Sequence, residues 1–68
     1  MVNTDILSGK WKQLKGEVKK QWGRLTDDDL QIVEGQHEKL IGLVQERYGY
    51  ARERAEQEVE RFLNQYND

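Results

Sequence analysis

Residues 11–22 read WKQLKGEVKKQW. Four apolar side chains in this stretch recur at steps of three, four and four residues: Trp11, Leu14, Val18 and Trp22. This spacing places them along one stripe of an α-helix, with charged side chains on the other faces. The pattern predicts an amphipathic helix that begins near Ser8 as N-cap and runs to Trp22, with Gly23 as a left-handed C-terminal cap.

The remaining sequence predicts three more short helices. One begins after Thr26, whose hydroxyl can cap free N–H groups while the aspartates at 27–29 face the positive end of the helix dipole, and Gly35 ends it. The next helix spans about residues 36–48, and the last spans about residues 50–66. Strands are not expected, because no five-residue run alternates cleanly and no hairpin turn dipeptide is present.

We therefore predict an all-α fold, a small bundle of four short helices arranged as two similar helical pairs, in a single domain over residues 1–68. The apolar stripes of these helices define the predicted core: Trp11, Leu14, Val18, Trp22, Leu25, Leu30, Val33, Leu40, Ile41, Val44, Tyr48, Val59 and Phe62. The core is thin, because a chain of this length buries only about 60% of its unfolded surface. The chain has no cysteine, so no disulfide supports the fold.

An internal repeat supports the paired arrangement. The six glycines fall into two sets that an offset of 26 residues superimposes: Gly9, Gly16 and Gly23, then Gly35, Gly42 and Gly49. Gly16 and Gly42 lie opposite the apolar stripes, where each costs about 0.8–1.0 kcal/mol relative to alanine. Three explanations stay open. Another backbone approaches there, as in weak self-association, or the helices are soft, or the small cost is tolerated.

The composition limits the classes of protein. Charged and hydrophobic residues each make up 35% of the 68 residues, and the net charge is −2. The longest apolar run, residues 40–44, is far shorter than the roughly 20 residues that span a bilayer. Residues 1–10 show no basic segment leading into an apolar one, as a signal peptide would. A small cytoplasmic protein is expected.

Several motifs resemble the CsbD-like family of small bacterial general-stress proteins. They are GKWKQLKG at residues 9–16, WGRLTDDD at residues 22–29, Glu34-Gly35 followed by Leu40 and Gly42, and QERYGY at residues 45–50. The resemblance covers about residues 3–60. It implies a small all-helical protein made under general or osmotic stress, hydrophilin-like, with no enzyme activity, cofactor or established ligand. The mean hydropathy of −1.04 fits such a protein.

No constellation of side chains predicts a chemical site. The one histidine, His37, has Glu34 and Glu38 within a helical turn, but a closed metal site needs more ligands in a fixed geometry. The aspartates at 27–29 lack the alternating ligands, central glycine and distal glutamate of a calcium loop. Ser8 and His37 would need a water-excluding pocket, which a chain this short can hardly enclose. We therefore predict no catalytic, cofactor-binding or metal site and no small-molecule substrate.

The charge distribution offers an alternative function. Residues 1–25 carry six basic and two acidic side chains, whereas residues 26–68 carry five basic and eleven acidic ones. Lys12, Lys15 and Lys19 form a ridge beside the apolar stripe, and such a ridge can track the phosphates of nucleic acid or of an anionic membrane. In the competing interpretation, the acidic half screens the ridge and both tryptophans lie in the core. The sequence leaves open the molecular target, the oligomeric state and the inducing signal.

Overall fold

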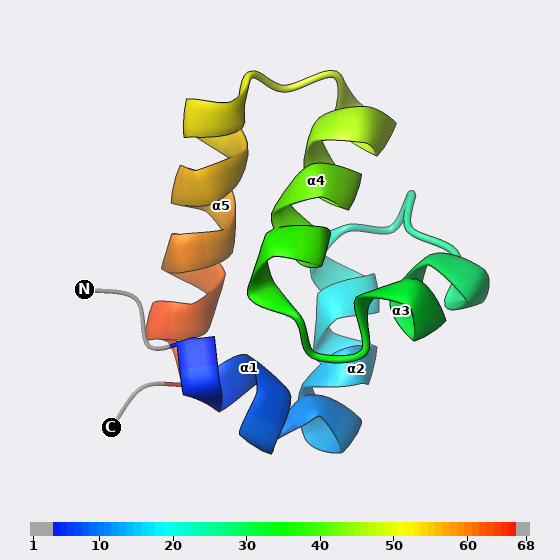
Figure 1. The fold of residues 1–68 in the computed structure, drawn as a ribbon, viewed down its shortest axis with the longest axis vertical. Helices are drawn as coiled ribbons and strands as arrows, with labels where there is room; N and C mark the ends of the chain where they lie inside the picture. The colour runs from blue at the N-terminus through cyan, green and yellow to red at the C-terminus, as the bar shows by residue number, and fades with distance from the viewer. Residues whose placement is uncertain (1–3, 67–68) are drawn as a thin grey trace.

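The computed structural model describes residues 4–66, which form five helices and no strand (Figure 1). The helices are α1 (Thr4–Gly9), α2 (Trp11–Gln21), α3 (Asp27–Val33), α4 (His37–Tyr48) and α5 (Arg52–Asn64). The predicted all-α fold is confirmed, with one short helix more than expected. The parts of the predictions that concern residues 1–3 and 67–68 lie outside the described residues.

Helix α4 is the central helix, since α1, α3 and α5 all contact it. Helices α4 and α5 pack side by side as an antiparallel hairpin, joined by a short connection (Figure 1). Helices α1 and α3 also contact α4, and α1 contacts α2. In the view of Figure 1, α1 lies at the foot of the hairpin and α3 lies beside α4.

One hydrophobic core joins all five helices. Eleven of the thirteen predicted core residues are buried, and the other two, Trp11 and Tyr48, are half-buried and pack against the edge of the core. The predicted core omitted three buried hydrophobic residues: Leu7, Ala55 and Leu63. Since a fully buried large apolar side chain contributes roughly 1.5–3 kcal/mol, this single cluster is the main source of stability in so short a chain.

The prediction for the first helix was wrong in its boundaries. The chain breaks at Lys10, which has φ −117° and ψ 24°, so that α1 and α2 are separate helices. Ser8 consequently lies inside α1 and is not the N-cap of α2. The physical reason is the core, because the break turns α1 back so that Leu7 is fully buried.

The C-terminal end of α2 also differs from the prediction. Gly23 does not adopt a left-handed conformation, and the capping residue is Trp22 with φ −124° and ψ 79°. Trp22 is 2% exposed and its ring packs on that of Phe62, with 5.1 Å between centroids. The backbone therefore leaves the helix one residue earlier than expected, in the conformation that carries this indole into the core.

The start of α3 and the end of α4 follow the sequence signals, whereas the C-cap of α3 is Glu34, with a left-handed φ of 44°, one residue before Gly35. Thr26 caps α3 as predicted, and Asp29 completes a capping box with it. Gly35 and Gly49 have left-handed backbones, with φ of 79° and 71°. Gly35 is also a site of close approach, because a Cβ there would lie 2.9 Å from the Cα of Ser8. Glycine at this position lets α1 cross the α3–α4 connection.

The internal repeat relates α2 to α4 more closely than α3 to α5. Equivalent apolar residues of α2 and α4 are buried, as in Val18 and Val44, and the equivalent glycines Gly16 and Gly42 both lie exposed in mid-helix. A Cβ built at either glycine meets no atom within 4 Å. In contrast, α3 has 7 residues and α5 has 13. Among residues 4–66, no backbone of another element approaches either glycine.

Candidate functional site

Asp29 is the buried charged residue of the described part of the chain. Its carboxylate accepts a hydrogen bond from the Thr26 amide at 3.1 Å, while the Thr26 hydroxyl accepts one from the Asp29 amide at 3.1 Å. Arg47 donates two more, from Nε to Oδ2 at 3.0 Å and from Nη2 to Oδ1 at 2.8 Å. The Arg47 guanidinium, followed by the Thr26 amide, holds the pKa of the Asp29 carboxyl well below its usual range. This carboxylate in turn raises the pKa of Arg47.

The motifs at residues 22–29 and 45–50 meet at this ion pair. The amide of Arg24 donates to the Tyr48 hydroxyl at 3.2 Å, and the Arg24 guanidinium carbon lies 5.3 Å from the centroid of the Tyr48 ring. The sequence prediction missed these contacts, because residues 18 or more positions apart leave no local periodicity to detect. The cluster links the α2–α3 connection to the end of α4, and the Asp29 carboxylate receives its hydrogen bonds from Thr26 and Arg47 within it. Its geometry is that of a structural contact that holds these two segments together, and we call the Asp29–Arg47 ion pair at its centre the Asp29–Arg47 tie.

The residues considered for metal binding do not converge. All three aspartates lie in the first turn of α3, as expected of helix-start acids, but Asp27 pairs with Lys19 while Asp29 pairs with Arg47. His37 is half-buried at the start of α4, and its buried Nε2 has no hydrogen-bond partner. Across residues 4–66, no three His, Cys, Asp or Glu side chains are grouped so that they can hold a metal ion.

The lysine ridge on α2 is partly neutralised. Lys12 and Lys19 are exposed and Lys15 is half-buried. The Nζ of Lys19 lies 2.7 Å from the Oδ1 of Asp27, and this contact, with a smaller effect of Lys15, lowers the pKa of Asp27. The competing interpretation is therefore right for one end of the ridge and for Trp22. The other end, at Lys12, has no salt bridge to any carboxylate of the described side chains.

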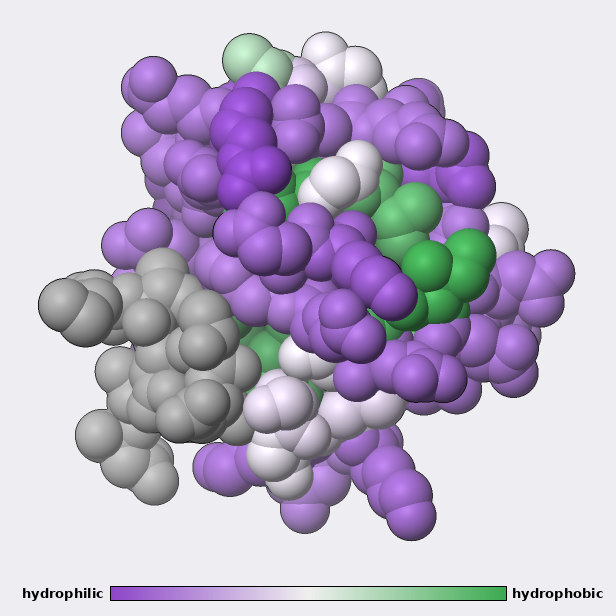
Figure 2. All heavy atoms as spheres, in the orientation of Figure 1, coloured by the Kyte–Doolittle hydropathy of each residue, from purple (hydrophilic) through white to green (hydrophobic). Residues whose placement is uncertain are grey.

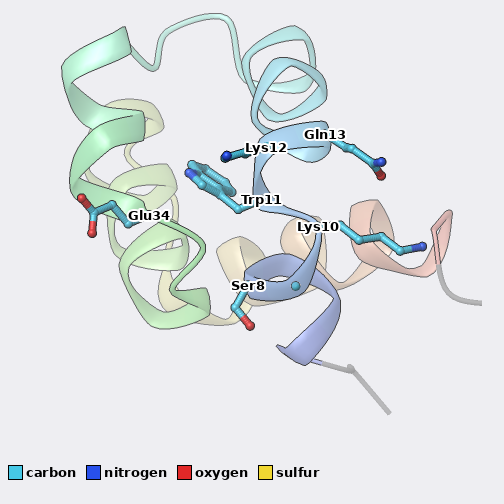
Figure 3. Close-up of a pocket in the computed structure, with 7 residues that line it drawn as sticks. Ser8, Lys10, Trp11, Lys12, Gln13 and Glu34 are labelled. Atoms are coloured by element: carbon cyan, nitrogen blue, oxygen red, sulfur yellow. The ribbon is translucent and has the colours of Figure 1, made fainter.

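A shallow hollow lies beside Lys12, at the start of α2 (Figure 3). Its volume is about 560 Å³, and it is open to solvent along the surface. Trp11 projects toward the α3–α4 side of this hollow, with Glu34 across from it (Figure 3). Lys10, Lys12 and Glu34 are all exposed, so water reaches these charged groups. The hollow can accept a surface contact, but it does not provide the water-excluding site that catalysis by Ser8 would need.

The face of the molecule drawn in Figure 2 is mostly hydrophilic, with charged and polar side chains over its greater part and a small apolar area near the position of α3. Ile32, on α3, is 56% exposed and is the large apolar side chain that stands out on the described surface. None of the helices in residues 4–66 has the length and apolar character to cross a membrane.

Comparison with known proteins decides the family. A profile described as CsbD-like matches residues 5–57. The chain belongs to the CsbD-like family. The resemblance predicted from the motifs is thereby confirmed, and the matched range contains both halves of the Asp29–Arg47 tie.

The relatives of this CsbD-like chain are bacterial proteins. It is 59% identical over 61 residues to UPF0337 protein PA4738 of Pseudomonas aeruginosa, and the aligned residues cover 90% of this chain and 94% of that protein. It is 59% identical over 58 residues to UPF0337 protein ECA0631 of Pectobacterium atrosepticum, with 85% and 84% covered. It is 57% identical over 58 residues to UPF0337 protein YjbJ of Escherichia coli K12, also with 85% and 84% covered.

Proposed function

We propose that this chain is a non-enzymatic, hydrophilin-like protein of the bacterial cytoplasm that acts during osmotic or general stress. Membership in the CsbD-like family, whose profile matches residues 5–57, is the observation that carries the proposal. The hydrophilic surface and the mean hydropathy of −1.04 support it. The internally satisfied Asp29–Arg47 tie and the open hollow at Trp11 give catalysis no supporting geometry.

The physical basis of protection is the charged surface. When water is scarce, charged side chains retain hydration and keep unfolded neighbours from associating through their apolar surfaces. The chain has no cysteine that oxidation can damage. Because the core is small, we expect a small free energy of unfolding and refolding that relies on contacts between residues close in sequence. The protein can therefore lose structure on drying and regain it on rehydration.

The proposal is tested by drying a labile enzyme together with this chain. The expected result is that the enzyme keeps more activity after rehydration than it does with the same mass of an inert globular protein. If the inert protein preserves the activity equally well, the protective role is wrong. A variant with Val18→Asp, which places a charge in the core, shows whether protection requires the fold.

A second candidate function is the binding of nucleic acid or an anionic membrane through Lys12, Lys15 and Lys19. The exposed ammonium group of Lys12 has no salt bridge among the described side chains and lies beside the half-buried Trp11. This arrangement favours such binding, because a cation next to an indole suits phosphates and stacked bases. Such binding would weaken steeply with salt. The test is retention on DNA, RNA or anionic vesicles at about 50 mM salt, where counterion release still favours binding. No retention on any of the three excludes this function.

A further inference from the structure

Two exposed helix faces, each with a glycine at its centre, occupy equivalent positions in the two copies of the internal repeat. One is centred on Gly16 of α2 and the other on Gly42 of α4, and both glycines are exposed. A Cβ at either position would have no atom within 4 Å. A glycine in mid-helix weakens the helix relative to alanine, and no described residue fills the space that either glycine leaves. Of the explanations open from the sequence, contact with a second molecule is the one that uses this space.

The two faces carry opposite charges at the same spacing. Four residues before and after Gly16 stand Lys12 and Lys20. Four residues before and after Gly42 stand Glu38 and Glu46. Positions three and four apart on a helix are neighbours on one face. The α2 face therefore presents Lys12 and Lys20 around its glycine, with Lys19 beside them, and the α4 face presents Glu38 and Glu46 around its own, with Lys39 at its edge.

Glu38, Glu46 and Lys20 keep most of their side-chain surface exposed, and Lys12 is exposed as well. Glu38 is bonded to Arg52, and Glu46 is bonded to Arg47, yet their side chains are 71% and 67% exposed. Lys20 lies 3.5 Å from Glu17 and is 79% exposed. Each carboxylate has two oxygens and each ammonium has three donors, so every one of them retains capacity for a second partner.

We propose that two copies of this chain associate by docking the α2 face of one copy on the α4 face of the other. The glycine at the centre of each face lets the two helix backbones approach closely, because the interaxial distance depends on the side chains at the crossing. Lysines of one copy then lie against glutamates of the other. Because both charges flanking each glycine have the same sign, opposite charges meet whether the helices run parallel or antiparallel. The contact joins two different faces, so it is heterologous.

The contact is electrostatic and therefore weak and salt-dependent. At about 0.1 M salt the screening length is about 10 Å, and at about 1 M it is about 3 Å. The wild-type chain is expected to associate at about 1 mM protein, where contacts of millimolar affinity are half formed, and to become monomeric at about 1 M salt. Analytical ultracentrifugation measures both. A wild-type chain that stays monomeric at about 1 mM protein in low salt overturns the proposal.

Charge reversal tests which faces meet. Lys12→Glu with Lys20→Glu makes both faces acidic, and Glu38→Lys with Glu46→Lys makes both basic. Each double variant is expected to lose association by tenfold or more, and an equal mixture of the two is expected to recover it. The control is Glu53→Lys with Glu60→Lys on the exposed surface of α5, which changes the net charge as the α4 variant does but must associate like the wild type. Failure of the mixture to recover association overturns the pairing.

Replacement of the glycines separates association from stability. Gly16→Leu and Gly42→Leu each meet open space inside the chain and exchange glycine for a better helix former, so the melting temperature of the monomer is expected to rise. Association is expected to fall by tenfold or more, because leucine holds the backbones apart. Variants that melt higher and still associate like the wild type show that the glycine faces are not the contact, and the proposal is then wrong.

Discussion

At the scale of single residues, Asp29 carries two roles that are usually separate. It completes the capping box of α3 and is the buried partner of Arg47, which reaches it from α4. The Asp29 side chain is 4% exposed, whereas that of Arg47 is 38% exposed. Removal of Arg47 therefore leaves a buried carboxylate without its strongest donors. The stability of the fold is for this reason sensitive to substitution of either partner.

Arg47→Met is expected to lower the free energy of unfolding by about 2 kcal/mol, as when hydrogen bonds to a charged group are lost. Urea denaturation followed by circular dichroism measures the change. The matched control is Arg52→Met, because Arg52 pairs with the exposed Glu38 and Glu56. Such surface pairs contribute only about 0–1 kcal/mol, so equal losses in the two variants would contradict the importance of the tie.

The same carboxylate predicts how stability depends on pH. The folded-state pKa of Asp29 lies below its ordinary value, so in acid the unfolded chain binds more protons than the folded chain. Its contribution is fully present above the ordinary aspartate pKa of about 4 and is lost as the pH falls below it. The melting temperature is therefore expected to fall between neutral pH and pH of about 3.

Asp29→Asn is the control for this pH dependence. The variant is less stable at neutral pH, because it loses the charged partner of Arg47, but its melting temperature should change less between the two pH values. An unchanged pH profile in Asp29→Asn would assign the acid sensitivity to other carboxylates. Asp27 and Glu38, whose pKa values are lowered by hydrogen bonds from Lys19 and Arg52, are the next groups to replace.

At the scale of helices, the two kinds of glycine predict opposite effects of the same substitution. Gly16→Ala is expected to raise the free energy of unfolding by about 0.8–1.0 kcal/mol, because its Cβ meets open space. Gly35→Ala is expected to lower it by more than about 1 kcal/mol, since φ is 79° and the Cβ would press on the Cα of Ser8. Thermal denaturation of both variants measures the difference. A stabilising Gly35→Ala would contradict the described crossing of α1.

The short helix α1 can be tested by one core substitution. Leu7 is fully buried, so Leu7→Ala is expected to cost about 2–5 kcal/mol if α1 packs as the structure shows. Ile32→Ala is the control, because Ile32 is 56% exposed and its truncation should change stability by less than about 0.5 kcal/mol. A loss at Leu7 no larger than at Ile32 would mean that α1 does not belong to the core.

The helices with long apolar stripes were predictable from the sequence, and α1 was not. Val18 and Val44 belong to regular stripes of three or more turns, so their burial follows from periodicity alone. Helix α1 has only six residues, too few for a stripe, and its position depends on contacts with α2 and α4. The Asp29–Arg47 tie was missed for the same reason, because it joins residues that only the tertiary fold brings together.

At the scale of the whole molecule, the small size leaves the apolar side chains a single core and places the charged side chains on the surface. The described chain measures 30 × 24 × 17 Å, and its apolar side chains form one core. The hollow at Trp11 is open to solvent along the surface. The functions proposed above therefore use the charged surface, either toward other proteins and water under stress or toward a second copy of the chain.

Protection is measured most directly by the activity that a labile enzyme retains after drying, as a function of the mass of this chain added before drying. If the charged surface protects other proteins, the retained activity rises with added mass and exceeds, at every mass, that obtained with an inert protein of similar size. A curve that coincides with that of the inert protein would contradict the proposal that the charged surface of this CsbD-like bundle protects other proteins.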